Sequence, residues 1–189
     1  MPMHPYPVEL VSQVCARNGE PVVIRPIRPE DAELERAFFD SLSDESRYQR
    51  FFYRMNELTP SMLARFTHVD YDRELALVAV VGEARDAAST AFIGVARYVM
   101  SEERDCAEYA IVVHDDWRRQ GIGRTLMERL IVAAKRKGLR RLEGAVLREN
   151  ATMLAFAASL GFSTQDNPGD SQQTLTMLEL TTGQDTMRG

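Results

Sequence analysis

The feature that most constrains this chain is a glycine loop between a strand-like stretch and an amphipathic one. The loop RRQGIGRTLM, residues 118–127, holds two glycines one residue apart among several arginines. The preceding stretch CAEYAIVVHDDW (106–117) is typical of a strand, and Ile122, Leu126 and Leu130 recur after the loop at helical spacing. A strand that turns through glycines into a helix predicts a mixed α/β domain.

The remaining elements are predicted on both sides of this unit. The order is strand, helices, three strands, helix, strand, helix, strand, and the runs 74–84 and 91–100 are expected to form an antiparallel hairpin. Thr59 and Asn150 are expected to cap helices. The predicted strands span 21–29, 74–84, 91–100, 106–117, 140–147 and 174–180, and the predicted helices span 29–43, 44–55, 59–69, 121–138 and 150–161. Residues 1–20 are expected to form an irregular arm or linker, 21–180 one domain, and 181–189 a disordered tail.

Composition excludes several classes of protein. A formal net charge of -5 argues against a nucleic-acid binder, which needs a basic face to neutralise phosphates. No apolar run approaches the ~20 residues needed to span a bilayer, and the N-terminus lacks the pattern of a signal peptide, so the cytoplasm is expected. Two cysteines, Cys15 and Cys106, form no pattern of a disulfide scaffold or zinc site, and no metal is predicted.

The loop has the chemistry of a phosphate-binding site. The free N–H groups at a helix N-terminus attract phosphate oxygens, and Gly121 and Gly123 allow a close approach, while nearby arginines add charged donors. A Walker loop would need a Lys-Ser/Thr pair, and a dinucleotide loop would need glycine where Leu126 stands. A plain tight turn with solvated arginines stays open at this point.

Two segments give the chain a resemblance to a known family. The loop resembles the acetyl-CoA pyrophosphate loop of the GNAT N-acetyltransferases, [RQ]-x-x-G-x-[GA], with Arg118 or Gln120, Gly121 and Gly123 in the motif positions. The stretch ENATMLAFAASLGF (149–162) resembles the second cofactor segment of that family. The stretches HPYPVEL, IRPIRPEDAELERAFFDSLSDESRYQRFF and HVDYDRELALVAVV resemble the acetyltransferase domain of Pat-type protein lysine acetyltransferases.

The resemblance implies a fold, a cofactor and its binding residues. The fold would be that of the GNAT family, an α/β (α+β) domain whose mixed, mostly antiparallel sheet contains a splayed pair of strands. The cofactor would be acetyl-CoA, with coenzyme A as product. The implied cofactor-binding residues are Ile111, Val112, Val113, Arg118, Arg119, Gln120, Gly121, Ile122, Gly123, Arg124, Thr125 and Asn150.

The resemblance also implies a catalytic residue. In the related lysine acetyltransferases a glutamate in an AE[FY]A stretch is the general base, and here that residue is Glu108. A solvated carboxylate, or one paired with an arginine such as Arg97, is the structural alternative. His114 is another candidate base because of its intrinsic pKa, and Cys106 as an acyl carrier is a further alternative. Ala157 stands where many relatives have a tyrosine that protonates the leaving thiolate.

The acceptor is the part of the function that the sequence determines least. The resemblance implies direct attack by a protein lysine in a ternary complex, with an acyl-CoA synthetase as one candidate substrate. A small-molecule amine acetyltransferase and a non-catalytic acyl-CoA sensor are the alternatives, and a homodimer is left open. Residues 70–74 (DYDRE) are either an acidic rim for the acceptor or a solvated loop.

Overall fold

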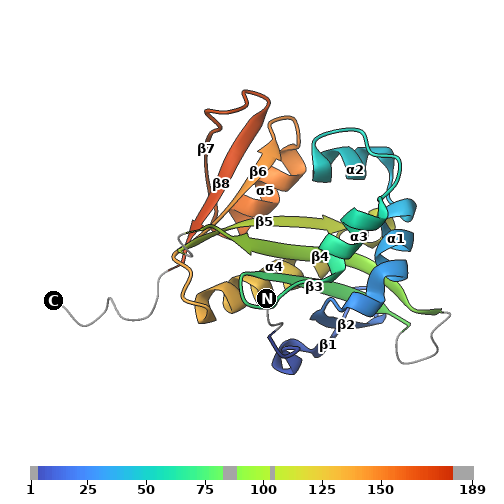
Figure 1. Ribbon diagram of the computed structural model, residues 1–189. Helices are drawn as coiled ribbons and strands as arrows, with labels where there is room; N and C mark the ends of the chain where they lie inside the picture. Colours follow the sequence, from blue (N-terminus) through green and yellow to red (C-terminus); the bar gives the residue numbers. More distant parts are fainter. Residues whose placement is uncertain (1–3, 83–88, 103–104, 181–189) are drawn as a thin grey trace.

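One eight-stranded sheet organises the protein (Figure 1). The computed structural model describes residues 4–82, 89–102 and 105–180. The strand order is β1-β2-β3-β4-β5-β6-β8-β7, and neighbouring strands are antiparallel except for the parallel pair β5 and β6. The strands are β1 Ser12–Cys15, β2 Pro21–Pro26, β3 Glu74–Val81, β4 Ala91–Met100, β5 Cys106–Val113, β6 Arg141–Leu147, β7 Ser163–Asp166 and β8 Gln173–Glu179. This arrangement confirms the predicted fold class.

The helices lie on both faces of the sheet. On one face α1 contacts β4 and α3, and α2 contacts β5, while α4 packs against β3, β4 and β5. The α-helices are α1 Ala32–Ser41, α2 Asp44–Phe51, α3 Pro60–Thr67, α4 Ile122–Arg136 and α5 Ala151–Ser159. Single 3-10 turns cover Val8–Leu10, Pro29–Asp31 and Asp115–Trp117.

Local sequence signals explain where the helices begin and which side they bury. The Thr59 hydroxyl accepts a hydrogen bond from the N–H of Met62 with Pro60 at the first helical position, as predicted. The apolar stripe of α4 is buried as predicted, with Leu126 and Leu130 fully inaccessible. Burial of this stripe fixes the orientation of α4, and with it the loop at the N-terminus of α4.

The sheet opens between β5 and β6. These two strands pair only from Cys106 to Glu108, whose partner in register is Glu143. Beyond that pair β5 stays bound to β4 as far as Val113, while β6 stays bound to β8. The Tyr109 ring lies against Gly144 where the pairing ends, and a Cβ at Gly144 would lie 2.7 Å from that ring. The close approach of the ring therefore requires glycine at this point of the divergence.

The structure differs from the sequence-based elements at several edges. Ser12–Cys15, expected in an irregular arm, is strand β1, and β7 was not predicted because its four residues are polar and exposed. The strand expected over 106–117 ends at Val113, where a 3-10 turn follows, and the one expected over 21–29 ends at Pro26. The predicted disordered tail, 181–189, and most of the expected turn at 85–90 lie outside the described residues.

Candidate active site

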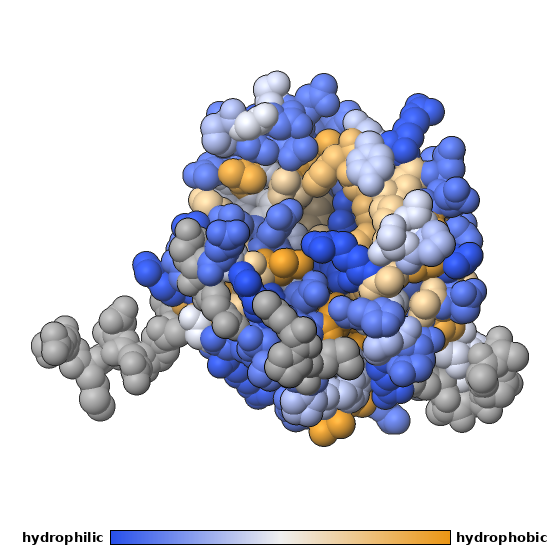
Figure 2. Space-filling view, viewed as in Figure 1, coloured by the Kyte–Doolittle hydropathy of each residue, from blue (hydrophilic) through white to orange (hydrophobic). Residues whose placement is uncertain are grey.

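A large groove follows the opening between β5 and β6. Its volume is about 520 Å³, within the range of small-molecule and cofactor sites. Figure 2 shows this face of the molecule hollowed between the lobe of β6 to β8 and α5 and the lobe that carries α2, with apolar side chains on the walls. Of the predicted site residues, those that line the groove are Glu108, Ile111, Val112, Val113, Arg118, Arg119, Gly121, Gly123, Arg124 and Asn150.

The glycine loop forms one end of this groove. Gly121 is the N-cap of α4 with φ of +89°, a left-handed conformation that favours glycine. No side chain caps α4, so the first N–H groups of the helix keep their bonding capacity. A Cβ at Gly123 would sit in ordinary contact with Val113, Phe156 and Ile111. The loop thus presents free N–H donors and a partial positive charge to the groove, which suits a phosphate.

The hairpin between β1 and β2 holds the loop in this conformation. The N–H of Arg17 donates to the carbonyl of Gln120 at 3.2 Å, and the Arg17 guanidinium donates to the carbonyl of Arg119 at 3.2 Å. The N–H of Asn18 donates to the side-chain oxygen of Gln120 at 3.0 Å. Arg119 itself has φ of +62°, which is uncommon outside glycine. These bonds engage loop oxygens and use none of the N–H groups of the loop.

Arginines concentrate at the same end of the groove. Arg118 donates to the Ser46 hydroxyl at 2.8 Å and lies 3.2 Å from the Asp115 carboxylate. Asp115 accepts hydrogen bonds from Ser43 and Ser46, and these bonds lower the pKa of Asp115 although its partial burial acts to raise it. Asp115 therefore ties the start of α2 to the loop. Arg118 is oriented by these contacts while it still lines the groove.

The exposed backbone edge of β5 forms the floor of the groove. The N–H of His114 donates to the carbonyl of Ile93 on the β4 side. Because bonding alternates along an antiparallel ladder, the N–H and C=O groups of Ile111 and Val113 point away from β4. β6 has already diverged from β5 at these residues. The groove therefore offers backbone donors and acceptors that an extended amide-containing chain could pair with.

Glu108 lies at the point where the strands part. It is exposed, lines the groove, and is the last residue of β5 that pairs with β6. Five residues of extended strand separate it from Val113, or about 17 Å along the groove. Among the described residues Glu108 has no hydrogen bond or ion pair from its carboxylate, so the pairing with Arg97 that was the alternative does not form. Its carboxylate is available to a bound amine.

Other candidate residues lie elsewhere. Ile122 is buried under the sheet, Thr125 donates its hydroxyl to the Gly121 carbonyl, and the Gln120 side chain is held by Asn18, so their side chains support the loop rather than line the groove. His114 accepts a hydrogen bond from the N–H of Asp116 at the turn after β5 and is not in the lining. Cys106, the alternative acyl carrier, is not in the lining either. Ala157 is buried, so this position offers no proton donor to the groove.

Sequence reasoning missed a larger set of lining residues, some of them beside predicted ones and others on α2 and the turn after β1, which are distant in sequence. The Pro-rich start of the chain gave no signal for Arg17, and no site residue was predicted on the helix that became α2. The residues in this set are Arg17, Glu45, Ser46, Gln49, Arg50, Phe52, Tyr109, Ala110, Trp117, Ala145, Val146, Thr152, Met153 and Phe156.

Within the described residues no group of three or more metal-binding side chains occurs and no helix is long and apolar enough to cross a membrane.

Comparison with known proteins agrees with this geometry. The model of the Acetyltransferase (GNAT) family matches residues 32–162. An acetyltransferase of Pseudomonas aeruginosa is 35% identical over 166 residues, which cover 86% of each chain. The crystal structure of the GNAT domain of S. lividans PAT is 28% identical with a TM-score of 0.84, covering 93% of this chain and all of that one. A shorter match, 40% identical over 55 residues, covers 29% of this chain and 37% of an Escherichia coli ribosomal protein bS18-alanine N-acetyltransferase.

Proposed function

Because this chain belongs to the GNAT family of acetyltransferases, which transfer an acetyl group from acetyl-CoA, we propose that its acceptor is the ε-amine of a protein lysine and that Glu108 is the general base. The position of Glu108 in the groove, where β5 and β6 diverge, carries the second part of the proposal. The likeness to the GNAT domain of S. lividans PAT supports the first part. The Escherichia coli relative acetylates an alanine of a ribosomal protein, so it supports a protein acceptor but not the choice of a lysine.

The groove residues suit acetyl-CoA. The glycine loop and its arginines would hold the phosphates, and the backbone edge at Ile111 and Val113 would pair with the amides of the extended arm. Acetyl-CoA supplies the acetyl group as a thioester. With the phosphates at the loop, an extended arm along β5 leads toward Glu108, so one straight strand sets the distance between the binding end and the reactive end.

The task of Glu108 follows from the chemistry of the acceptor. A lysine amine has an ordinary pKa of about 10.4 and is protonated at neutral pH, and the protonated form has no lone pair for attack. The exposed carboxylate of Glu108 attracts the ammonium group and takes its proton directly or through one water molecule. Since residue 157 is alanine, its side chain donates no proton to the departing thiolate.

The base is tested by Glu108→Gln, which keeps the shape of the side chain and removes its charge. Turnover should fall at least about a hundredfold, while acetyl-CoA binding measured by calorimetry stays as in the wild type. Glu143→Gln is the matched control, because Glu143 is the register partner of Glu108 but does not line the groove. Full turnover in Glu108→Gln would exclude this residue as the base.

The acceptor needs a separate experiment. Labelled acetyl-CoA is incubated with the enzyme and a host lysate, and labelled proteins are identified with the position of the modified residue. We expect label on lysine side chains, and none when the Glu108→Gln variant replaces the wild type. Label found only on small amines, with proteins untouched, would contradict a protein acceptor.

A further inference from the structure

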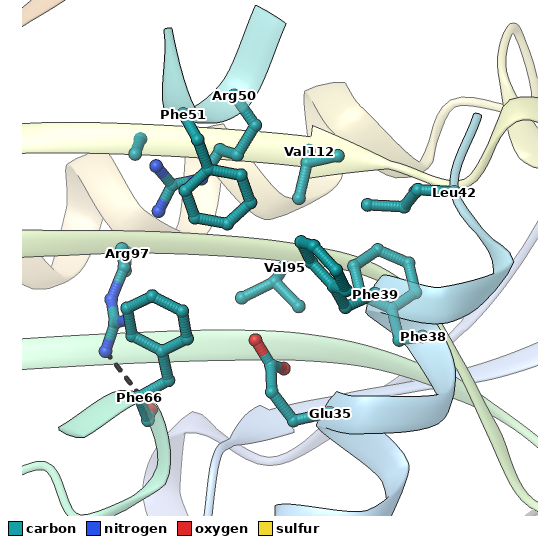
Figure 3. Close-up of a pocket in the computed structure, with 11 residues that line it drawn as sticks. Glu35, Phe38, Phe39, Leu42, Arg50, Phe51, Phe66, Val95, Arg97 and Val112 are labelled. Atoms are coloured by element: carbon teal, nitrogen blue, oxygen red, sulfur yellow. Dashed lines mark hydrogen bonds between the residues drawn. The ribbon is translucent and has the colours of Figure 1, made fainter. Parts of the chain in front are cut away.

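Three charged side chains line a cavity of about 20 Å³ beneath the groove (Figure 3). Glu35 reaches it from α1, Arg50 from α2 and Arg97 from β4, and phenylalanine rings such as Phe51 and Phe66 surround them. The cavity is large enough for about one water molecule. It is separate from the phosphate end, since no residue of the glycine loop lines it.

The cluster is incompletely satisfied by its own contacts. Glu35 is 8% exposed, and one of its carboxylate oxygens is buried with no hydrogen-bond partner in the described chain. Arg97 donates to the Phe66 carbonyl at 3.2 Å, but its Nε is buried without a partner among the same residues. The Arg50 guanidinium lies 4.8 Å from the centre of the Phe51 ring, and no described residue gives it a hydrogen bond or a carboxylate within ion-pair distance.

Positive charge exceeds negative charge in this cluster. Two guanidinium groups share the lining of the cavity with one carboxyl, and Glu74 outside the lining also acts on Arg97. Burial raises the pKa of Glu35 to about 7, so that carboxyl is only partly ionised at neutral pH. Burial and the neighbouring Arg97 lower the pKa of Arg50 to about 10, which still leaves Arg50 protonated. A cation held near low-dielectric surroundings without a full counter-charge is costly, and an anion that pairs with it would remove that cost.

Arg50 is also the link between the cluster and the groove. It lines both the cavity and the groove, and Glu108 is among the charges that act on it. Glu108 and Arg50 therefore place a carboxylate and a guanidinium under each other's influence in the groove, whose lining also includes the carboxylate of Glu45. We propose that Arg50 binds an anionic group that the acceptor carries beside its reactive amine, so that the preferred lysine has a glutamate or aspartate as its neighbour.

This inference rests on the proposed lysine acetylation and adds a specificity-determining residue to it. Glu108 and Arg50 together complement an amine and a carboxylate presented by the same acceptor. A guanidinium is well suited to the second role, since its planar set of donors matches a carboxylate. The same pair of charges would select a free amino acid, whose own carboxylate accompanies its amine, and the experiment separates these two sources.

The experiment compares short blocked peptides that hold one lysine flanked by glutamate, by glutamine or by arginine. For the wild type, kcat/KM should be at least about tenfold higher with glutamate than with glutamine, as expected for a charge-assisted hydrogen bond, and lowest with arginine. Arg50→Gln should bring the glutamate-to-glutamine ratio close to one, and Arg50→Lys should keep part of it. Arg54→Ala is the control, because Arg54 is an exposed arginine just after α2 that does not line the groove.

Each result decides the proposal. Equal use of the glutamate and glutamine peptides by the wild type would overturn it whether or not the variants fold, and so would a ratio unchanged in Arg50→Gln. Free lysine and lysinamide form the second arm. If peptides are not acetylated but lysine is favoured over lysinamide in the wild type and not in Arg50→Gln, the anionic subsite stands and the protein acceptor is wrong. Equal use of lysine and lysinamide would then overturn the subsite too.

Discussion

Replacing Glu35 with glutamine should make the protein more stable at alkaline pH and leave its stability nearly unchanged at acid pH. Glu35 lies on α1 with its carboxyl turned into the cavity beneath the groove, and one of its oxygens has no partner among the described residues. Ionisation of this carboxyl places a charge in a buried site surrounded mostly by apolar side chains. Glutamine has nearly the same shape and carries no charge, so the substitution isolates the cost of ionisation.

The size of the effect follows from the pKa of Glu35, which is raised from 4.5 to about 7. Burial is the main cause and Asp31 adds to it, while Arg97 and Arg50 oppose it. Because the folded-state pKa is the higher one, the associated stability is fully present below pH 4.5 and is lost as the pH rises through about 7. A shift of this size corresponds to about 3 kcal/mol, since each pKa unit is worth about 1.4 kcal/mol.

Urea unfolding at a series of pH values between 4 and 8.5 measures this effect. The free energy of unfolding of Glu35→Gln minus that of the wild type should rise by about 3 kcal/mol across the series, with most of the rise between pH 4.5 and 7. Glu33→Gln is the control, because the Glu33 side chain is 85% exposed on the same helix, and its difference should stay flat. Parallel curves for Glu35→Gln and the wild type would refute the reasoning.

Two further predictions concern a buried ion pair and the loop. The Arg25 guanidinium is 2% exposed and donates two hydrogen bonds of 2.7 and 2.8 Å to the Asp31 carboxylate. Asp31→Asn removes the charge of that buried acceptor and should lower the free energy of unfolding by about 3 kcal/mol in urea titrations. Gly121→Ala places a Cβ on a residue in the left-handed conformation, so it should lower the free energy of unfolding by about 1 kcal/mol and weaken acetyl-CoA binding in calorimetry. Gly123 does not have that conformation, so Gly123→Ala should unfold like the wild type.

The loop and its flanking elements could be predicted because their signals are local. A strand, a pair of glycines and an apolar stripe all lie within residues 106–136, and each part of that pattern restricts the backbone over a few residues. The N-caps at Thr59 and Asn150 were predictable for the same reason, since a cap bonds to an N–H three residues away. Such features need no knowledge of how distant segments pack.

The hairpin of β1 and β2 could not be predicted, because what it does depends on a contact across the chain. Arg17 and Asn18 bond to a loop 102 residues away in sequence. In the sequence this segment is short, rich in proline nearby and only weakly alternating, which is typical of an arm. Its pairing with β2 is local, but its four residues alternate only between half-buried and exposed, so no strongly apolar face marks the strand in the sequence.

The charges of the groove show why a sum over the sequence is a poor guide to a site. The net charge of -5 argues against a protein that depends on a basic surface, yet the loop end of the groove gathers Arg17, Arg118, Arg119 and Arg124. Charges on the far surface are screened within about 10 Å in ordinary buffer, whereas those in the groove act at contact distance. A phosphate in the groove therefore responds to the local arginines.

At the reactive end the same argument applies to Arg50, whose charge is opposed only in part by Glu35 and Glu108. The choice of acceptor then depends on a few side chains that only the fold brings together.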